Sequence, residues 1–195
     1  MKSTMLIFLW LNIITLRLIF HIMVSSNLAR KLSKIKIVLT DVDGVLTDGG
    51  MYYTKEGDIM KKFHARDGMG FTLLRKQKIP TIIITKEKTK MVKEWSKKMS
   101  IEHLYDGIQV KSSILPKIIK KYKIQAKNIA FIGDDVNDIE LLQKIGLSVT
   151  PNDGIAEVKQ ISDYICKNTG GNAAFRELSD LILISKKTII GKSRL

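Results

Sequence analysis

The chain has 195 residues, of which 33 are Lys or Arg and 19 are Asp or Glu, so its formal net charge is +14. This length fits one α/β domain, and the 45% of hydrophobic residues excludes a generally disordered chain. The single cysteine, Cys166, excludes an internal disulfide and a cysteine-cluster zinc site, and it indicates a reducing, cytoplasmic compartment.

The positive charge is unevenly placed along the chain, but it forms no single dense stripe. Six of the net charges lie in the first forty residues, which contain no acid, and the later lysines are scattered among acids and isoleucines. A nucleic-acid-binding domain typically has one dense basic stripe. The pattern therefore favours a solvated lysine-rich face, and we expect no nucleic-acid partner.

Residues 5–24 form an apolar run whose length is sufficient to cross a bilayer as a helix. Arg17 falls beyond the midpoint of this run, where a charge is costly to insert. Three interpretations stay open: a weak membrane anchor with the following domain in the cytoplasm, an interfacial helix, or a translated upstream extension with Met23 as the working start. Membrane contact is expected only under the first two. We treat residues 1–34 as an apolar, basic leader.

Residues 35–185 alternate between strand-like and helix-like segments, and residues 186–195 form a basic tail. Strands are expected at residues 35–39, 81–84, 103–105, 129–132, 147–149 and 164–166. Helices are expected at residues 70–78, 88–98, 112–122, 135–144, 155–160 and 174–184. Residues 51–53 and 59–63 flank a polar turn, which predicts a β-hairpin after the first strand. The alternation predicts a three-layer, Rossmann-like α/β fold with a parallel sheet and helices on both faces.

Acidic side chains follow two of the expected strands. Asp41 and Asp43 come after the first strand, and Asp134 and Asp135 come after the strand at 129–132. Each cluster alone also fits a capped turn or a helix start. Because ligands bind at the carboxyl ends of parallel strands, the two clusters are expected to meet at one edge. Crowded carboxylates repel unless a cation is present, and an all-oxygen site suits Mg²⁺.

Four motifs occur in a fixed order: DVDGVLTDGG at 41–50, Thr85 after an apolar strand, Lys111, and GDDVND at 133–138. Together they resemble the motifs of the haloacid dehalogenase superfamily of phosphohydrolases. Within it, the chain is similar to the capless branch that contains 3-deoxy-D-manno-octulosonate 8-phosphate phosphatase and nonulosonate 9-phosphate phosphatases. Four segments carry that likeness: FHARDGMGFTLL at 63–74, HLYDGIQVK at 103–111, GLSVTPNDG at 146–154 and TGGNAAFREL at 169–178.

The resemblance implies a role for each motif residue. Asp41 resembles the nucleophile that becomes an aspartyl-phosphate, and Asp43 resembles the general acid that protonates the leaving sugar oxygen and then activates water. Thr85 and Lys111 would bind the transferring phosphoryl group. Mg²⁺ would be held by the Asp41 side chain, the Asp43 backbone carbonyl and Asp134. Two further acids would orient the metal waters and the lysine: Asp135 and Asp138.

The resemblance also implies how the substrate, a small sugar phosphate, is selected. No cap domain fits, because 44 positions separate Asp41 from Thr85 and 26 separate Thr85 from Lys111. The branch is tetrameric, and the hairpin at 48–63 and the tail of neighbouring subunits would close the site. A homotetramer is therefore expected. Four side chains are expected to bind the sugar: Arg66, Asp67, Glu87 and Arg176.

The chain departs from the branch pattern after the second strand, where it reads Thr85-Lys86-Glu87 in place of Thr-Gly-Arg or Thr-Gly-Glu. Glu87 resembles members that act on nine-carbon sugars, so octulosonate 8-phosphate and nonulosonate 9-phosphate both stay open as substrates. Lys86 leaves open a non-catalytic, phosphatase-like module that partners an acylneuraminate cytidylyltransferase. The net charge leaves open a third alternative, a phosphatase of nucleic-acid ends.

Overall fold

The structure is a computed structural model in which residues 26–192 are described, with side chains up to residue 186. The apolar run at 5–24 lies outside the described residues. Residues 26–33 form a helix, and Leu32 from this helix is buried in the core, so the packing of the domain begins inside the segment expected to be a leader. Within residues 26–192, none of the helices combines the length and the apolar character that a membrane crossing requires.

The centre of the fold is a six-stranded parallel sheet, as predicted. Its strands are β1 (Ile37–Thr40), β4 (Thr81–Ile84), β5 (His103–Tyr105), β6 (Ile129–Ile132), β7 (Leu147–Thr150) and β8 (Tyr164–Ile165). They lie in the order β5-β4-β1-β6-β7-β8. The chain adds β4 and β5 on one side of β1 and then β6, β7 and β8 on the other, so the switch point of the strand order lies between β1 and β6. Thr40 at the end of β1 is in register with Ile83 and Ile132. The residues that follow these three strands therefore lie at one edge, where such sheets bind ligands.

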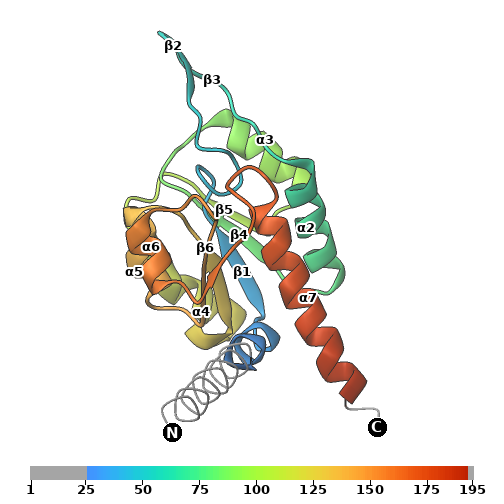
Figure 1. Cartoon of the computed structure of the whole chain (residues 1–195). Helices are drawn as coiled ribbons and strands as arrows, with labels where there is room; N and C mark the ends of the chain where they lie inside the picture. Colours follow the sequence, from blue (N-terminus) through green and yellow to red (C-terminus); the bar gives the residue numbers. More distant parts are fainter. Residues whose placement is uncertain (1–25, 193–195) are drawn as a thin grey trace, which may run out of the picture.

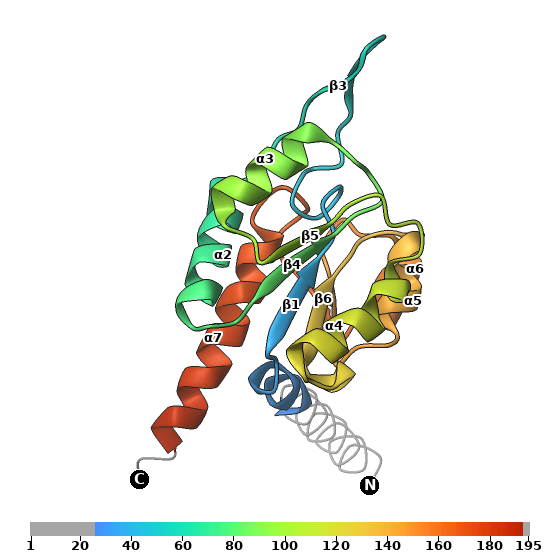
Figure 2. The ribbon, with the colours of Figure 1, turned by 180° about the vertical axis from the view of Figure 1, so that it is seen from behind.

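Helices cover both faces of the sheet, which confirms the three-layer prediction (Figures 1 and 2). One face is covered by α2 (Ala65–Lys76), α3 (Lys90–Met99) and α7 (Ala174–Lys192). The other face is covered by α4 (Leu115–Tyr122), α5 (Ile139–Leu142) and α6 (Ala156–Ile161). Side chains of a strand alternate between the two cores: Val38 packs in the first, and Ile37 and Leu39 pack in the second. Both faces of the sheet are therefore apolar, and polar side chains gather at its edges.

Three helices differ by more than three residues, at one end or both, from those expected. Helix α2 begins at Ala65 rather than at residue 70, because the side chain of His64 accepts a hydrogen bond from the Arg66 amide and caps the helix in spite of two glycines in the first turns. Helix α7 continues to Lys192 rather than ending at 184, since no proline interrupts it. The segment expected at 135–144 is divided into a 3₁₀ turn, η3 (Val136–Asp138), and the short α5.

The predicted hairpin is present as β2 (Tyr52–Thr54) and β3 (Gly57–Met60), an antiparallel pair that projects from the body of the molecule (Figure 1). Its apolar side chains are solvent-exposed, among them Tyr53 at 59% and Ile59 at 61%. The hairpin and α2 occupy the chain between Asp41 and Thr85, and α3 and β5 occupy the chain between Thr85 and Lys111. The fold is therefore capless, as predicted.

The loop before α7 braces the loop that follows β1. The Gly171 amide donates to the Val45 carbonyl over 3.0 Å, and the Gly170 amide donates to Asp153 Oδ1 over 2.8 Å. A Cβ atom at Gly170 would lie 1.9 Å from the carbonyl oxygen of Gly44. The two backbones are in contact, so a side chain at position 170 would displace the segment after β1.

We predict that Gly170→Ala lowers the free energy of unfolding by about 1–3 kcal/mol, because two backbone segments must separate to admit the methyl group. Urea denaturation measures the change. Gly50→Ala is the matched control, since its Cβ would meet first a carboxylate oxygen of the flexible Asp48 side chain, at 3.1 Å. Equal stabilities of the two variants would contradict the bracing contact.

Candidate active site

The first group in the site is a buried carboxylate at the end of β1. The Asp41 amide continues the sheet by donating to the Ile132 carbonyl of β6 over 3.0 Å. The residue is 5% exposed, and burial raises the pKa of its carboxyl to about 7 although the charge of Lys111 opposes the shift. A carboxylate in this position costs free energy unless cations accompany it.

Lys111 is the cation that meets Asp41. It begins the 3₁₀ turn η1 (Lys111–Ile114), is 1% exposed, and places its ammonium 2.8 Å from Asp41 Oδ2 and 2.6 Å from Asp138 Oδ1. Burial alone would lower the pKa of this ammonium, but the charges of Asp41 and Asp138 raise it above the ordinary lysine value. Lys111 is therefore a permanent cation held between two acids.

The acids after β6 complete a cluster of carboxylates. One oxygen from each of Asp41, Asp134 and Asp138 lies within 4.8 Å of the others. Asp138 is already engaged, since Oδ1 accepts from Lys111 and Oδ2 accepts from the Asp134 amide over 3.0 Å. Asp134 is different: burial, followed by the charges of Asp41 and Asp138, raises its pKa to about 8, and its Oδ1 is buried without a hydrogen-bond partner among residues 26–192.

This donor set fits a hard divalent cation. Asp41 and Asp134 offer anionic oxygens whose mutual repulsion a cation would relieve, and Mg²⁺ prefers oxygen ligands. Gly44 makes the approach possible: its φ is +78°, and a Cβ there would lie 2.0 Å from Asp134 Oδ2. The role expected for the Asp43 backbone carbonyl as a third ligand stays a prediction.

Asp43 lies beside this cluster, and a lysine that sequence reasoning missed holds its side chain. Lys61 Nζ lies 2.6 Å from Asp43 Oδ1, and the Lys61 side chain is 2% exposed. Burial would lower the pKa of Lys61, but the hydrogen bond and charge of Asp43, together with Asp58, raise it. The extended spacing indicates only that the side chains of these two consecutive lysines point to opposite sides, and it does not identify Asp43 as the partner of either.

The clustered carboxylates open into a cavity of about 250 Å³ at the carboxyl edge of the sheet. The structure brings Asp41, Asp43, Asp134, Thr85 and Glu87 together in its lining, with the exposed Lys86 among them. Thr85 is buried, and its hydroxyl accepts from the Glu87 amide over 3.2 Å. The cavity therefore combines acids that can hold a cation with a hydroxyl and an ammonium that can meet an anion.

The other three residues expected to bind a sugar are not in this cavity. Arg66 and Arg176 line a separate cavity of about 600 Å³ between α2, β8 and α7, where Arg176 Nε pairs with Asp180 over 2.9 Å. Asp67 is fully buried and accepts from the Arg176 amide over 2.8 Å, so it joins α2 to α7, and burial raises its pKa to about 6. Their role in binding substrate stays a prediction.

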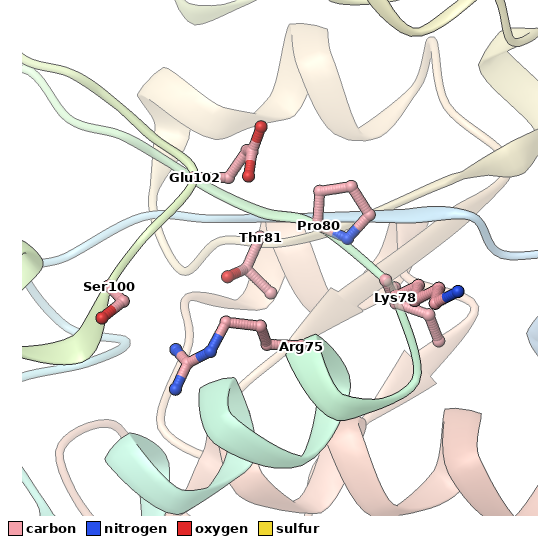
Figure 3. A pocket seen from close by; sticks show the side chains of 7 residues that line it. Arg75, Lys78, Pro80, Thr81, Ser100 and Glu102 are labelled. Atoms are coloured by element: carbon pink, nitrogen blue, oxygen red, sulfur yellow. The ribbon is translucent and has the colours of Figure 1, made fainter.

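A further cavity, of about 200 Å³, lies at the opposite edge of the sheet (Figure 3). It is lined by residues at the amino ends of β4 and β5 and the end of α2, among them Pro80, Thr81 and Glu102. Arg75 extends into this region and donates to the Met99 carbonyl over 2.7 Å. None of the site residues expected from the sequence lines it, and ligands of parallel sheets bind at the other edge.

Comparison with known proteins agrees with this geometry. A family model described as a haloacid dehalogenase-like hydrolase matches residues 71–178. The 3-deoxy-D-manno-octulosonate 8-phosphate phosphatase of Escherichia coli strain K12 is 35% identical over 163 residues, which cover 84% of this chain and 87% of that protein.

Solved structures share the fold over most of the chain. A Legionella pneumophila protein described as a HAD superfamily (subfamily III A) hydrolase has a TM-score of 0.84 and 34% identity, covering 91% of this chain and 100% of that one. The 3-deoxy-D-manno-octulosonate 8-phosphate phosphatase of Moraxella catarrhalis, solved with a magnesium ion, a phosphate ion and a KDO molecule, has a TM-score of 0.79 and 34% identity. This match covers 85% of this chain and 97% of that one.

We predict that the metal-free protein loses stability as pH rises from about 4 to about 8. Over this range the unfolded chain has released the protons that Asp41 and Asp134 still hold in the folded state, so deprotonation favours unfolding. At about pH 8, Mg²⁺ should raise the melting temperature because it binds the folded carboxylates. Differential scanning fluorimetry at about pH 5 and pH 8, with and without Mg²⁺, measures both effects.

Asp134→Asn should reduce both the pH dependence of stability and the rise in melting temperature on addition of Mg²⁺. It removes one of the two carboxyls, Asp41 and Asp134, on which both effects depend. Glu157→Gln, at an exposed acid on α6, is the control and should behave as the wild type. A Mg²⁺ shift of wild-type size in Asp134→Asn would rule Asp134 out as a ligand.

Proposed function

The chain belongs to the haloacid dehalogenase-like hydrolases, in the family of the 3-deoxy-D-manno-octulosonate 8-phosphate phosphatases, and we propose that it hydrolyses the phosphate monoester of a 3-deoxy-2-ulosonate through an aspartyl-phosphate on Asp41. It is a sugar-phosphate phosphatase of this superfamily. The observation that carries the proposal is the contact of 2.8 Å between Lys111 and Asp41. Asp41 lines one cavity together with Asp43 and Asp134.

In the first step, a carboxylate oxygen of Asp41 attacks phosphorus, and the bond between phosphorus and the sugar oxygen breaks. Asp43 gives its proton to the departing oxygen, which leaves as an alcohol. Lys111 offsets charge on the nucleophile and the phosphoryl group, and the Thr85 hydroxyl orients that group. Asp41, Asp134 and the Asp43 carbonyl would hold Mg²⁺, which would supply electrostatic stabilisation of the transferring phosphoryl group.

In the second step, Asp43 is a carboxylate and accepts a proton from the water that attacks the aspartyl-phosphate. The bond between phosphorus and Asp41 breaks, inorganic phosphate leaves, and both aspartates return to their starting states. The same carboxyl acts first as acid and then as base, so its orientation must suit both the sugar oxygen and the water.

Two sugar lengths are candidates. The relatives named for octulosonate 8-phosphate support the eight-carbon ester as the first, and Glu87 in the lining of the catalytic cavity supports nonulosonate 9-phosphate as the second. Lys86 adds a cation to the same lining. Unlike Lys111 it is exposed, so its ammonium can meet the phosphate or the sugar carboxylate.

We also propose a homotetramer in which the hairpin and the tail complete neighbouring sites. The exposed apolar side chains of the hairpin support it, since large apolar groups exposed together mark interaction surfaces. Arg66 and Arg176 line a cavity apart from Asp41, so they would contact sugar only across a subunit boundary. We propose residues 35–185 as the phosphatase domain, against which the helix at 26–33 packs through Leu32. The free, buried Cys166 supports a cytoplasmic location.

We predict that the purified protein releases phosphate from an ulosonate phosphate in the presence of Mg²⁺, and that Asp41→Asn lowers kcat by at least about 10⁴-fold because it removes the nucleophile. A panel of octulosonate 8-phosphate, nonulosonate 9-phosphate and neutral hexose phosphates, read by phosphate release, identifies the sugar. Rates for Asp41→Asn that equal the wild type would exclude the aspartyl-phosphate route.

Two outcomes of the same panel distinguish the alternatives. Absence of turnover together with stable binding of an acylneuraminate cytidylyltransferase would favour the non-catalytic module. Turnover of 5′-phosphorylated DNA, with an affinity that falls steeply as salt rises, would favour a phosphatase of nucleic-acid ends.

We predict that the double substitution Tyr53→Ser and Ile59→Ser dissociates the tetramer without unfolding the subunit, because these side chains are exposed in the isolated chain and pack against no core there. Light scattering coupled to size-exclusion chromatography measures the mass. Ile165→Thr, an exposed apolar residue at the sheet edge in β8, is the control. A mass that stays tetrameric in the hairpin variant would place the interface elsewhere.

A further inference from the structure

We infer that Lys61 is the positioning residue for the general acid Asp43, so that the hairpin supplies a part of the catalytic machinery; the inference rests on the proposed function. Lys61 follows directly on β3, the second strand of the hairpin. Its ammonium contacts one oxygen of Asp43 and approaches Asp58 of the same strand.

The geometry holds Asp43 by one oxygen and leaves the other unpaired within the described residues. Asp43 Oδ1 accepts from Lys61 Nζ over 2.6 Å and from the Thr47 hydroxyl over 3.3 Å. Asp43 Oδ2 is buried and has no hydrogen-bond partner within the described part of the chain. Since Asp43 lines the catalytic cavity, this second oxygen is the one that can exchange a proton with the sugar oxygen and then with water.

The burial of Lys61 separates it from an ordinary surface ion pair. Its side chain is 2% exposed, and it lies between two acids, with Asp58 Oδ2 at 3.6 Å. Removal of a buried cation leaves its partners uncompensated, which is costly. The neighbouring Lys62 also pairs with an acid, Asp48, over 3.1 Å, but its side chain is 60% exposed, and such pairs contribute little.

Lys61 and Lys111 therefore each hold one of the two catalytic carboxylates. Lys111, from the segment after β5, holds Asp41, whereas Lys61, from the hairpin, holds Asp43. Without Lys61, the Asp43 side chain keeps only the longer contact from Thr47 and can rotate away from the substrate. Proton transfer then suffers more than phosphate binding does, because Thr85 and Lys111 keep their positions.

The experiment compares esters that need the general acid to different degrees. The leaving group of p-nitrophenyl phosphate is a weak base and departs with little protonation, whereas the sugar alkoxide of 3-deoxy-D-manno-octulosonate 8-phosphate needs a proton. Lys61→Met should lower kcat/KM for the sugar phosphate by about 10²-fold or more, and for the aryl phosphate by less than about 10-fold. Lys61→Arg should restore part of the loss, and the control Lys62→Met should stay within about twofold of the wild type.

A second readout follows from the role of Asp43 as base. In Lys61→Met the aspartyl-phosphate should accumulate, so that p-nitrophenol appears in a burst of about one equivalent per site before slow turnover. Equal losses of kcat/KM on the two esters without a burst would overturn the inference, as would a Lys61→Met variant within twofold of the wild type on both. Lys61→Gln, which keeps a polar side chain, gives the same comparison if the methionine variant does not fold.

Crystal structures of Lys61→Met and Lys62→Met test the positioning independently of turnover. The Asp43 carboxyl should change its orientation in the first variant and keep it in the second; an unchanged Asp43 in both would overturn the inference. If the wild type hydrolyses neither ester, the proposed function has failed, and the two structures still decide whether Lys61 positions Asp43.

Discussion

Repulsion among buried carboxylates is the constraint around which this molecule is arranged. Asp41, Asp134 and Asp138 converge at the switch point of the strand order, between β1 and β6. Burial there raises the free energy of every negatively charged carboxylate. Lys111 compensates part of that negative charge. The raised pKa values of Asp41 and Asp134 indicate that the lysine alone does not compensate all of it. A divalent cation would compensate the remaining negative charge, and it would also attract an anionic phosphoryl group bound by Thr85 and Lys111.

The surrounding fold keeps these groups close against their repulsion. Parallel strands β1 and β6 place Asp41 and Asp134 at neighbouring ends, and the left-handed Gly44 lets the two loops approach within van der Waals distance. The loop at 169–171 packs against the segment after β1, where Gly170 lies against the backbone of Gly44. Glu177 at the start of α7 fixes that loop by accepting from several donors: the Lys167 and Asn168 amides, the Asn168 side chain and the Tyr164 hydroxyl.

Much of this arrangement could be predicted because it follows from local patterns. Short β-branched runs such as 81–84 identify strands buried on both faces, and acids directly after two of them identify one edge of the sheet. The start of α2 could not be predicted, since glycines obscure it and a cap at His64 decides it. The partner of Asp43 depends on how the hairpin folds back, and the placement of Arg66 and Arg176 away from Asp41 depends on how α2 packs on α7. Neither appears in sequence spacing.

The hairpin has a consequence for how its length can vary. Lys61 faces inwards and Lys62 faces solvent, because successive residues of an extended segment point to opposite sides. Loss or gain of one residue between the turn and position 60 would exchange the directions in which the two lysine side chains point. The lysine that now contacts Asp43 would then point towards solvent. A change of two residues would return each lysine side chain to its original side of the backbone. A change of one residue would therefore have to be absorbed by an irregularity such as the shift of register that the hairpin already has between Tyr52 and Tyr53, whereas the identity of its turn residues is under no such restriction.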